Sequence, residues 1–486
     1  MILANLNLTL DSFSKIPLSR QLTDRLRREI IEGNIATGSI LPSIRDLAVK
    51  LNISRSTVMR CYEELAGQGY IVVTPGSGTT VCRRLPGDLE RMTAPLELEP
   101  DVNFIPATCS DYSQRLLKVA QDGLPQSTSF LNYGGPALDA APIDRWRELI
   151  AMHIKTLHTE HCPSAGFLPL RKAYSGYLAR TRAIRSDIDQ VFVFIARELR
   201  LDLICRLLLD PGDSVAVENP GYPGARKRFA VHGADVIPIP VDFQGMNIDY
   251  LCNLKKRIKI VYVTPSHHEP TGVVMPMTRR KKLLEWAEST GAIIVEDDYD
   301  SEFRYDSRTI PSLMSLDESD SVVHISCLWK TLSPVSKLGF MIVPQRLSEV
   351  LSCAKDLVER ETPLLESLVL TDFIEAGHLE KIISKNRKVY AARRNSLVDA
   401  LKNSFQSAVT MSAESAGMDL FVRIDTPLKE SEVLTHAEAA ALPIVSARPY
   451  YVDAAPGNEF IIPFSVIPEP QIETKIRNWS KRLQIS

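Results

Sequence analysis

The chain has 486 residues, 44% of them hydrophobic and 24% charged, with a formal net charge of −2. That composition is ordinary for a globular protein, and the length is enough for a large domain with a smaller one beside it. No stretch of about eighteen apolar residues predicts a membrane span, and the N-terminal residues lack the pattern of a signal peptide. The 8 cysteines form no CxxC pair, which is typical of free thiols in a reducing compartment, so we expect a cytoplasmic protein.

Two short helices are predicted between residues 43 and 65. Ser43 is expected to cap one helix, with Asp46 three residues later as its capping-box partner. The segment Asn52-Ile53-Ser54 interrupts the chain, and Ser54 is expected to cap a second helix that runs towards Leu65. Two capped helices separated by a tight turn predict a helix-turn-helix.

A glycine-rich hairpin follows the second helix. Residues 71–74 and 79–81 have the composition of strands, and the turn sequence Pro75-Gly76-Ser77-Gly78 lies between them. Helices, turn and wing in this order form a winged helix-turn-helix, whose second helix enters the major groove of double-stranded DNA. The residues expected at the DNA are Ser43, Arg45, Ser54, Arg55, Thr57, Gly76, Ser77 and Gly78.

Charge divides the chain in the same way. The first 83 residues carry ten basic and seven acidic side chains, a charge of +3, which leaves −5 for the rest of the chain. A mildly basic head on an acidic body suits a protein that reaches DNA with one end only.

The head resembles the winged-helix domain of the GntR family of bacterial regulators. The resemblance implies a DNA-binding domain over residues 12–83. Residues 84–101, where prolines and charges alternate, are then expected to form a linker. The matching positions are Pro17-Leu18, Gln21-Leu22, Leu26-Arg27, Ile30-Ile31, Gly33, Leu41-Pro42-Ser43-Ile44-Arg45, Leu47-Ala48, Ser54-Arg55-Ser56-Thr57-Val58, Tyr62, Leu65, Gly69-Tyr70 and Gly76-Ser77-Gly78-Thr79.

The remainder of the chain has the pattern of an α/β domain. Helical stretches such as 200–209 and 279–290 separate several apolar runs, which predicts a mostly parallel sheet buried on both faces. Ligands of such sheets bind at the carboxyl ends of the strands. The predicted strands are 191–195, 214–218, 236–240, 258–264, 292–296, 322–326 and 338–343.

Two of these strands are followed by residues that can carry chemistry. Acids and a tyrosine follow one strand in segment 293–300, and Lys330 follows another. A lysine at a buried position can form a Schiff base, and pyridoxal phosphate needs such a lysine together with an acid at its pyridine nitrogen. On spacing alone, an acidic loop with a salt-bridging lysine explains the same residues equally well.

A wider resemblance favours the first of these interpretations. The body is similar to fold-type-I pyridoxal-phosphate aminotransferases, and head and body together resemble the MocR subfamily of GntR regulators. The motifs that carry the resemblance are Pro169-Leu170-Arg171, Tyr177-Leu178, Leu209-Asp210-Pro211-Gly212-Asp213, Glu218-Asn219-Pro220-Gly221-Tyr222, Thr264-Pro265-Ser266-His267, Pro270-Thr271-Gly272, residues 296–305, residues 330–334 and Leu338-Gly339-Phe340.

The resemblance implies roles for single residues. Lys330 would be the catalytic lysine that binds pyridoxal phosphate, Asp297 would hold the pyridine nitrogen, Tyr299 would donate to the phenolic oxygen and Tyr222 would line the cofactor site. It also implies an aminotransferase-like domain over residues 102–486, with a smaller C-terminal α+β lobe from about residue 360, and a head-to-tail homodimer on paired DNA sites.

The chain departs from the family where the cofactor phosphate would bind. Ala196-Arg197-Glu198-Leu199 stands where the family has Gly-Ser-Gln-Gln, whose small and polar residues open a helix under the phosphate. Glu198 would repel the phosphate, whereas Arg197 would compensate in part. The other departures are Cys327 for a hydroxyl residue, Trp329 for serine, Lys337 for the phosphate-clamping arginine, and Glu269 beside the expected pyridine ring.

Three functions therefore remain open. The resemblance favours a DNA-binding regulator that binds pyridoxal phosphate and senses an amine or amino acid through it. The alternative is a regulator whose body has lost the cofactor and senses another ligand. The third and least favoured function is a working aminotransferase tethered to DNA. Net transamination is not expected, because Arg448 is only a weak candidate near the C-terminus for binding a substrate carboxylate. His153, His158 and His161 have no metal-ligand spacing, so no metal is expected.

Overall fold

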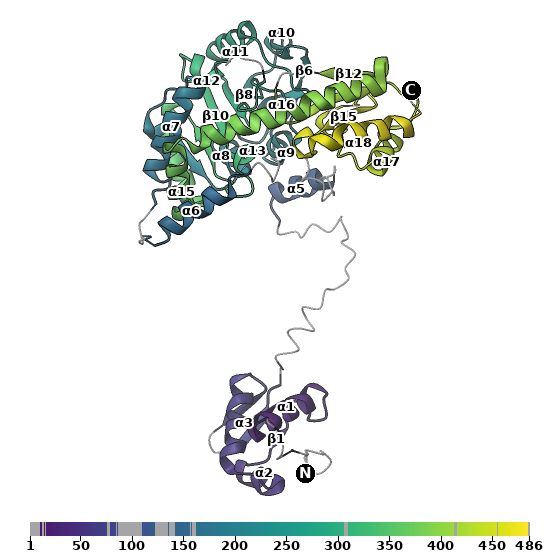
Figure 1. The fold of residues 1–486 in the computed structure, drawn as a ribbon. Helices are drawn as coiled ribbons and strands as arrows, with labels where there is room; N and C mark the ends of the chain where they lie inside the picture. Colours follow the sequence, from purple (N-terminus) through teal and green to yellow (C-terminus); the bar gives the residue numbers. More distant parts are fainter. Residues whose placement is uncertain are drawn as a thin grey trace. The chain divides into compact units, whose positions relative to one another are not determined.

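The structure, a computed structural model, divides into two compact units, Met1–Pro106 and Ala107–Ser486, which are described separately (Figure 1). No helix in the described part of the chain is long and apolar enough to cross a membrane. The residues described are 10–11, 14, 16–74, 78–83, 85, 109–121, 135, 141–155, 157, 162–305, 310–412, 416–453 and 455–484.

The N-terminal unit packs three helices against a small antiparallel sheet of order β1-β3-β2. Leu22, Leu26 and Ile30 recur at every fourth position of the first helix, so they form one apolar stripe, and all three are buried in the core of the head. The elements are α1 (Leu18–Ile31), β1 (Ile40–Leu41), α2 (Ile44–Leu51), α3 (Arg55–Gly67), β2 (Ile71–Thr74) and β3 (Gly78–Val81).

Both predicted helix caps are present. The Ser43 hydroxyl accepts a hydrogen bond from the Asp46 backbone N–H and donates one to the Asp46 carboxylate. The helix it caps ends at Asn52, whose φ of 52° is left-handed. Ser54 then accepts from the Thr57 N–H at 3.1 Å and opens α3. The sequence therefore located the helix-turn-helix correctly.

The body is built on an eight-stranded sheet of order β4-β11-β10-β9-β8-β5-β6-β7. All seven predicted strands are present. Five parallel neighbours lie at its centre, whereas β11 and β7 run antiparallel to their neighbours. The strands are β4 (Val191–Phe194), β5 (Ser214–Asn219), β6 (Asp235–Asp242), β7 (Gly245–Met246), β8 (Ile258–Val263), β9 (Ile293–Asp298), β10 (Val322–Cys327) and β11 (Gly339–Ile342).

Helices cover both faces of this sheet. Successive residues of a strand point to opposite faces, and β4 shows the consequence: Phe192 and Phe194 join one buried cluster, whereas Val191 and Val193 join another. The first cluster includes α8 (Arg197–Leu208), α9 (Pro223–Val231) and α14 (Gln345–Val358); the second includes α6 (Ile143–His153), α7 (Leu168–Arg182), α15 (Leu364–Glu375) and the start of α16 (His378–Phe405).

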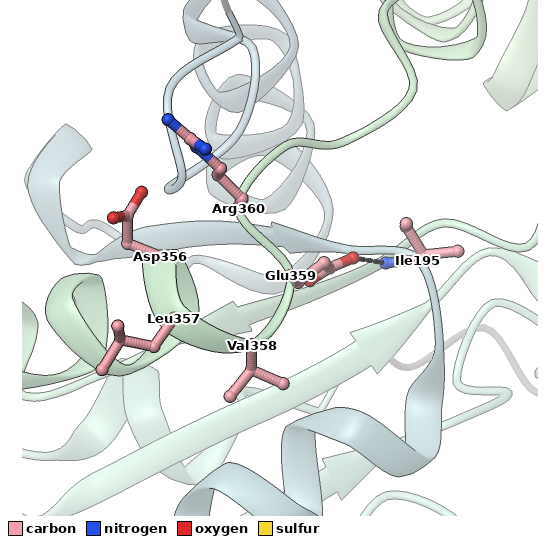
Figure 2. Close-up of a pocket in the computed structure, with 6 residues that line it drawn as sticks. All are labelled: Ile195, Asp356, Leu357, Val358, Glu359 and Arg360. Carbon is pink, nitrogen blue, oxygen red and sulfur yellow. Dashed lines mark hydrogen bonds between the residues drawn. The ribbon is translucent and has the colours of Figure 1, made fainter.

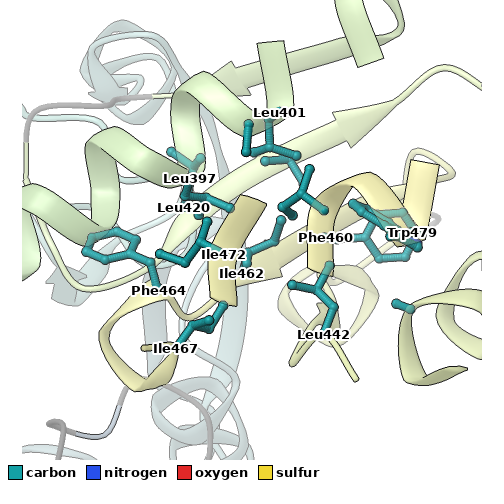
Figure 3. Close-up of a cluster of buried hydrophobic side chains, with 14 of the residues drawn as sticks. Leu397, Leu401, Leu420, Leu442, Phe460, Ile462, Phe464, Ile467, Ile472 and Trp479 are labelled. Carbon is teal, nitrogen blue, oxygen red and sulfur yellow. The ribbon is translucent and has the colours of Figure 1, made fainter. Parts of the chain in front are cut away.

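The C-terminal lobe has its own core (Figure 3). Leu397 and Leu401 of α16 pack there with Leu420 and with Trp479, all fully or nearly fully buried. The lobe contains a four-stranded sheet of order β12-β13-β15-β14, so the predicted α+β character is present. Its other elements are η4 (Gln406–Ala408), β12 (Val409–Ser412), β13 (Leu420–Ile424), α17 (Glu430–Ala439), β14 (Val445–Ser446), η5 (Arg448–Tyr450), β15 (Glu459–Ile462), η6 (Phe464–Val466) and α18 (Glu469–Arg482).

Short elements complete the body. In Figure 1 the long helix α16 (green) extends from the end of the body that holds α6, α7 and α15 to the end that holds α17 and α18 (yellow). The remaining elements are α5 (Asp111–Gln121), η3 (Ile188–Gln190), α10 (Ile248–Cys252), α11 (Met277–Thr290), α12 (Leu313–Leu316) and α13 (Trp329–Leu332).

Candidate functional site

The residues predicted to carry chemistry lie at one edge of the large sheet. Strands β4, β5, β8, β9 and β10 run in the same direction, so their carboxyl ends share that edge. Asp297 lies at the end of β9, Lys330 follows β10, and Tyr222 follows β5. This is the position at which α/β sheets bind ligands.

A cavity of about 380 Å³ lies at this edge. Among the predicted site residues, Lys330, Tyr299, Tyr222 and Lys337 all line it, whereas Asp297 is buried at the end of its strand and is not part of the wall. Several residues at which the chain differs from the family also form part of the cavity wall. The full wall is Ile195, Ala196, Glu198, Tyr222, Glu269, Tyr299, Cys327, Trp329, Lys330 and Lys337.

Lys330 is buried and has a carboxylate beside it. Its Nζ lies 3.6 Å from Oδ2 of Asp419 and 5.5 Å from the ring centres of Tyr299 and Trp329. Burial raises the pKa of Asp419, and the positive charge of Lys330 opposes that rise. Sequence reasoning missed Asp419, because it comes from the C-terminal lobe and no local motif marks it.

Asp297 and Tyr299, both in the acidic segment 293–300, have hydrogen-bond partners that the sequence did not indicate. Asp297 accepts a hydrogen bond from the Tyr262 hydroxyl on the neighbouring strand β8. The Tyr299 hydroxyl lies 2.9 Å from Nδ1 of His267, and Asp300 approaches the same nitrogen at 2.9 Å. Burial raises the pKa of Tyr299 well above its ordinary value, so the phenol stays protonated. These contacts fix Asp297 and Tyr299 in place.

His268 and Glu218 are two further buried titratable groups of the body. Burial lowers the pKa of His268 to about 3, and its Nε2 lies 3.0 Å from the Pro220 carbonyl oxygen, to which the neutral ring donates. Burial raises the pKa of Glu218 to about 8, and the carboxyl group accepts from the N–H and hydroxyl of Thr264. Both groups are therefore neutral near pH 7, and their hydrogen bonds serve to position the loops.

The segment between β4 and α8 forms the end of the cavity where the cofactor phosphate was expected. Ala196 precedes α8 and provides no side-chain cap, and Glu198 lies in the first turn of the helix. Lys337 is exposed. Arg197 begins the helix, but its side chain, predicted to assist at the phosphate, lies outside the described residues.

A further carboxylate binds the same segment (Figure 2). The Ile195 backbone N–H donates to Oε1 of Glu359 at 2.6 Å, in the wall of an open surface pocket of about 570 Å³ that also contains Leu357 and Val358. The other oxygen of Glu359 lies 3.1 Å from Nζ of Lys355, which is fully buried. A backbone donor at the start of this segment is thus already occupied by a carboxylate.

These observations test whether pyridoxal phosphate fits the site. At the end expected for the pyridine ring, Lys330 and Tyr299 line the cavity, and Asp297 lies buried at the end of β9. The phosphate end does not fit, because Glu198 places a carboxylate in the wall there, Glu359 already occupies the Ile195 N–H, and Cys327 and Lys337 stand where the family has a hydroxyl residue and an arginine. The described residues are therefore compatible with the pyridine end of the cofactor and not with its phosphate end.

The predicted DNA contacts are on the surface of the head. Arg45 in α2 and Arg55 at the start of α3 are exposed, and Thr57 is half-buried in the first turn of α3. The Ser54 hydroxyl lies 2.7 Å from the Thr57 hydroxyl. Of the wing residues, Gly78 begins β3 with a φ of 96°, and Gly76 and Ser77 lie outside the described residues.

Two family models match the chain. Residues 18–81 match the bacterial regulatory proteins of the gntR family, and residues 132–451 match aminotransferases of class I and II. The matches coincide with the helix-turn-helix unit and with most of the body.

Relatives and solved structures agree with this division. The chain is 30% identical to an uncharacterised HTH-type transcriptional regulator, YhdI, of Bacillus subtilis over 96% of both chains. It is 32% identical to the probable rhizopine catabolism regulatory protein MocR of Rhizobium meliloti, over 88% of this chain and 86% of that one. The chain is similar to the solved structure of kynurenine aminotransferase of Pyrococcus horikoshii, with a TM-score of 0.68 and 26% identity, over 82% of this chain and 98% of the other.

Domain order and relatives lead to one assignment. A GntR helix-turn-helix precedes a fold-type-I aminotransferase domain, as the sequence predicted. Relatives that align along nearly the whole length are named as transcriptional regulators. The chain therefore belongs to the MocR-type subfamily of GntR transcriptional regulators.

Proposed function

We propose that this regulator binds double-stranded DNA through α3 and the wing, and that an amine or amino acid bound in the Lys330 cavity changes the binding. The observation that carries the proposal is the cavity around a buried lysine, at the ligand-binding edge of the sheet, in a chain that also has a helix-turn-helix. An effector with different affinities for two conformations of the body would shift their populations.

We further propose that the body has lost pyridoxal phosphate, the alternative left open by the sequence. Three observations favour it over the cofactor-bound form: Glu198 lies in the cavity wall, Glu359 already occupies the Ile195 N–H, and Lys330 is paired with Asp419. Arg448, the candidate for binding a substrate carboxylate, is exposed in η5 and is not in the cavity wall, which agrees with a sensor that does not transaminate.

A homodimer on paired DNA sites completes the proposal. The family resemblance supports head-to-tail pairing, and dimeric helix-turn-helix proteins read two half-sites about one helical turn apart. We therefore expect the regulator to select DNA with a repeated half-site.

Selection from a random duplex library with the full-length protein tests the DNA-binding function. The wild type should show a strong enrichment of one sequence family, which Arg45→Ala and Arg55→Ala should each weaken. Arg147→Ala, an exposed arginine in α6 of the body, is the matched control and should retain it. Equal enrichment by all four proteins would show that the head does not read DNA through these residues.

Titration with pyridoxal phosphate tests the cofactor proposal separately. We expect no visible absorption band from lysine-bound cofactor at saturating concentration, in wild type or in Lys330→Ala. A band in wild type that is absent from Lys330→Ala would overturn this part and would leave the DNA-binding function unaffected.

A further inference from the structure

Met59 is an exposed apolar side chain in the recognition helix α3. The residue is 45% exposed. The fold buries other apolar residues of the same helix in the core of the head, namely Val58, Cys61, Tyr62 and Leu65. The core of the head therefore forms without Met59, and this side chain stays on the surface of the element that we propose to enter the major groove.

The neighbours of Met59 on the helix surface are polar. Single exposed apolar residues are common on protein surfaces, so these neighbours decide whether Met59 has a role. Residues three and four positions apart lie side by side on a helix, which places Arg55, Ser56 and Glu63 around Met59. Arg60 follows it directly, and all four polar residues are exposed. Met59 is the apolar member of this set.

The opposite side of α3 packs against α1 (Figure 1). The Thr23 hydroxyl of α1 donates to Glu64 at 3.2 Å, and Nε of Arg27 donates to Gln68 at 3.0 Å. Glu64 and Gln68 come five and nine positions after Met59, which at about 100° per residue places them about 140° and about 180° around the helix from it. Met59 therefore lies on the side of α3 away from α1 and is open to contact from outside the head.

Charge and position indicate that DNA makes this contact. Residues 1–83 carry a net charge of +3, and Arg45, Arg55 and Arg60 are exposed on α2 and α3. Met59 lies four residues after Arg55, the first residue of α3, and is thus in the N-terminal half of this 13-residue helix. In helix-turn-helix proteins the N-terminal residues of the recognition helix contact base edges.

Glu63 indicates that this side of the helix meets base edges and not the phosphate backbone. It lies one turn after Met59, and it has no ion pair or hydrogen bond among the residues that the structure describes. A carboxylate repels phosphates, and a thioether offers them no hydrogen-bond donor. Both side chains therefore suit the floor of the groove, where thymine presents an apolar group, its 5-methyl, and cytosine presents a donor that glutamate accepts from.

We propose that Met59 contacts the 5-methyl group of a thymine in the major groove and so helps to determine which DNA sequence the regulator selects. The flexible, unbranched thioether can adapt its shape to a single methyl group. This inference rests on the proposed DNA-binding function and names one base that it reads.

The test removes single methyl groups from the DNA. Each thymine in one half-site of the duplex selected from the random library is replaced in turn by uracil, which lacks the methyl group and keeps the hydrogen-bonding edge. Fluorescence anisotropy measures the affinity of the full-length protein for each duplex. For wild type, at least one replacement should weaken binding about fourfold, the effect of one buried methyl group.

Variants show whether Met59 makes the contact. Met59→Ala should bind the thymine and uracil duplexes equally at that position, because its side chain is too short to reach the methyl group. Met59→Leu keeps an apolar side chain of similar size and should retain the discrimination. Met152→Ala, which removes an exposed methionine from α6 of the body, is the matched control and should discriminate like wild type. Since Met59 lies outside the core, Met59→Ala should also keep the thermal stability of wild type.

Three results would overturn the inference. They are a selected half-site without thymine, a wild type that binds every uracil duplex as tightly as the thymine duplex, and a fourfold loss that persists in Met59→Ala. Each is obtained with a protein that binds its selected DNA, so none of them contradicts the DNA-binding function. A wild type that enriches no sequence would contradict that function, and the inference with it.

Discussion

Glu296 is a charged residue in the core of the body. It is fully buried, and its carboxylate accepts from the N–H groups of Leu313 and Met314 and lies 3.1 Å from Nδ1 of His324. Burial alone would raise the pKa of Glu296, but the hydrogen bond and charge of His324, with Arg280, lower it to about 2. One carboxylate thus holds β9, β10 and α12 together.

Replacing Glu296 by glutamine should therefore destabilise the body by about 3 kcal/mol or more, because Arg280 and His324 lose a buried partner. Urea unfolding followed by tryptophan fluorescence measures this change, since all 4 tryptophans lie in the body. Glu473→Gln in α18, which breaks an exposed pair with Arg477, is the control and should change stability by less than about 0.5 kcal/mol. Equal effects would contradict the assigned role.

The same carboxylate predicts a dependence on pH. A lowered pKa in the folded state means that the stabilisation is fully present above the ordinary glutamate pKa of about 4.3 and is lost as pH falls towards the folded value of about 2. The stability difference between wild type and Glu296→Gln should therefore shrink between pH 4 and pH 2. A difference that stays constant over this range would show that the carboxylate contributes no charge-dependent stability.

At the level of single residues, the sequence predicted the site in part. Lys330 and Tyr299 follow strand ends, where a local pattern marks them, whereas the family resemblance indicated Tyr222. The cavity brings all three together. Asp419 and Glu359 could not be predicted, because each reaches the site from a distant element through tertiary packing. No periodicity or motif encodes such a contact.

At the level of elements, the Ser54 cap should contribute to the stability of the recognition helix α3. Ser54→Ala should cost about 1 kcal/mol, because the Thr57 N–H loses its acceptor, and Ser54→Asn should restore most of it. Hydrogen exchange of the α3 amides in the full-length protein measures the change locally. Equal protection in Ser54→Ala and wild type would mean that the cap adds nothing to the helix.

Elements of the large sheet were easier to predict than those of the C-terminal lobe. The buried strands are continuous apolar runs bounded by turns, so β4, β5 and β8 were located within one or two residues. The strands of the lobe are short, and β14 has two residues only, too few for a period to appear. The sequence pattern could not predict that β11 runs antiparallel to its neighbours, because an apolar run shows that a strand is buried but not the direction in which it pairs.

At the level of the whole molecule, charge should govern the affinity of the regulator for DNA. Residues 1–83 carry a net charge of +3 and the rest of the chain −5, so the attraction is confined to the DNA-binding head. Each phosphate contact that is lost should reduce the slope of log affinity against log salt by about 0.9. Arg45→Ala and Arg55→Ala should each show that reduction on the selected site, and Arg147→Ala in the body should not. Fluorescence anisotropy at several salt concentrations measures the slopes. If an arginine variant loses sequence preference at an unchanged slope, its side chain contacts a base edge instead of the phosphate backbone.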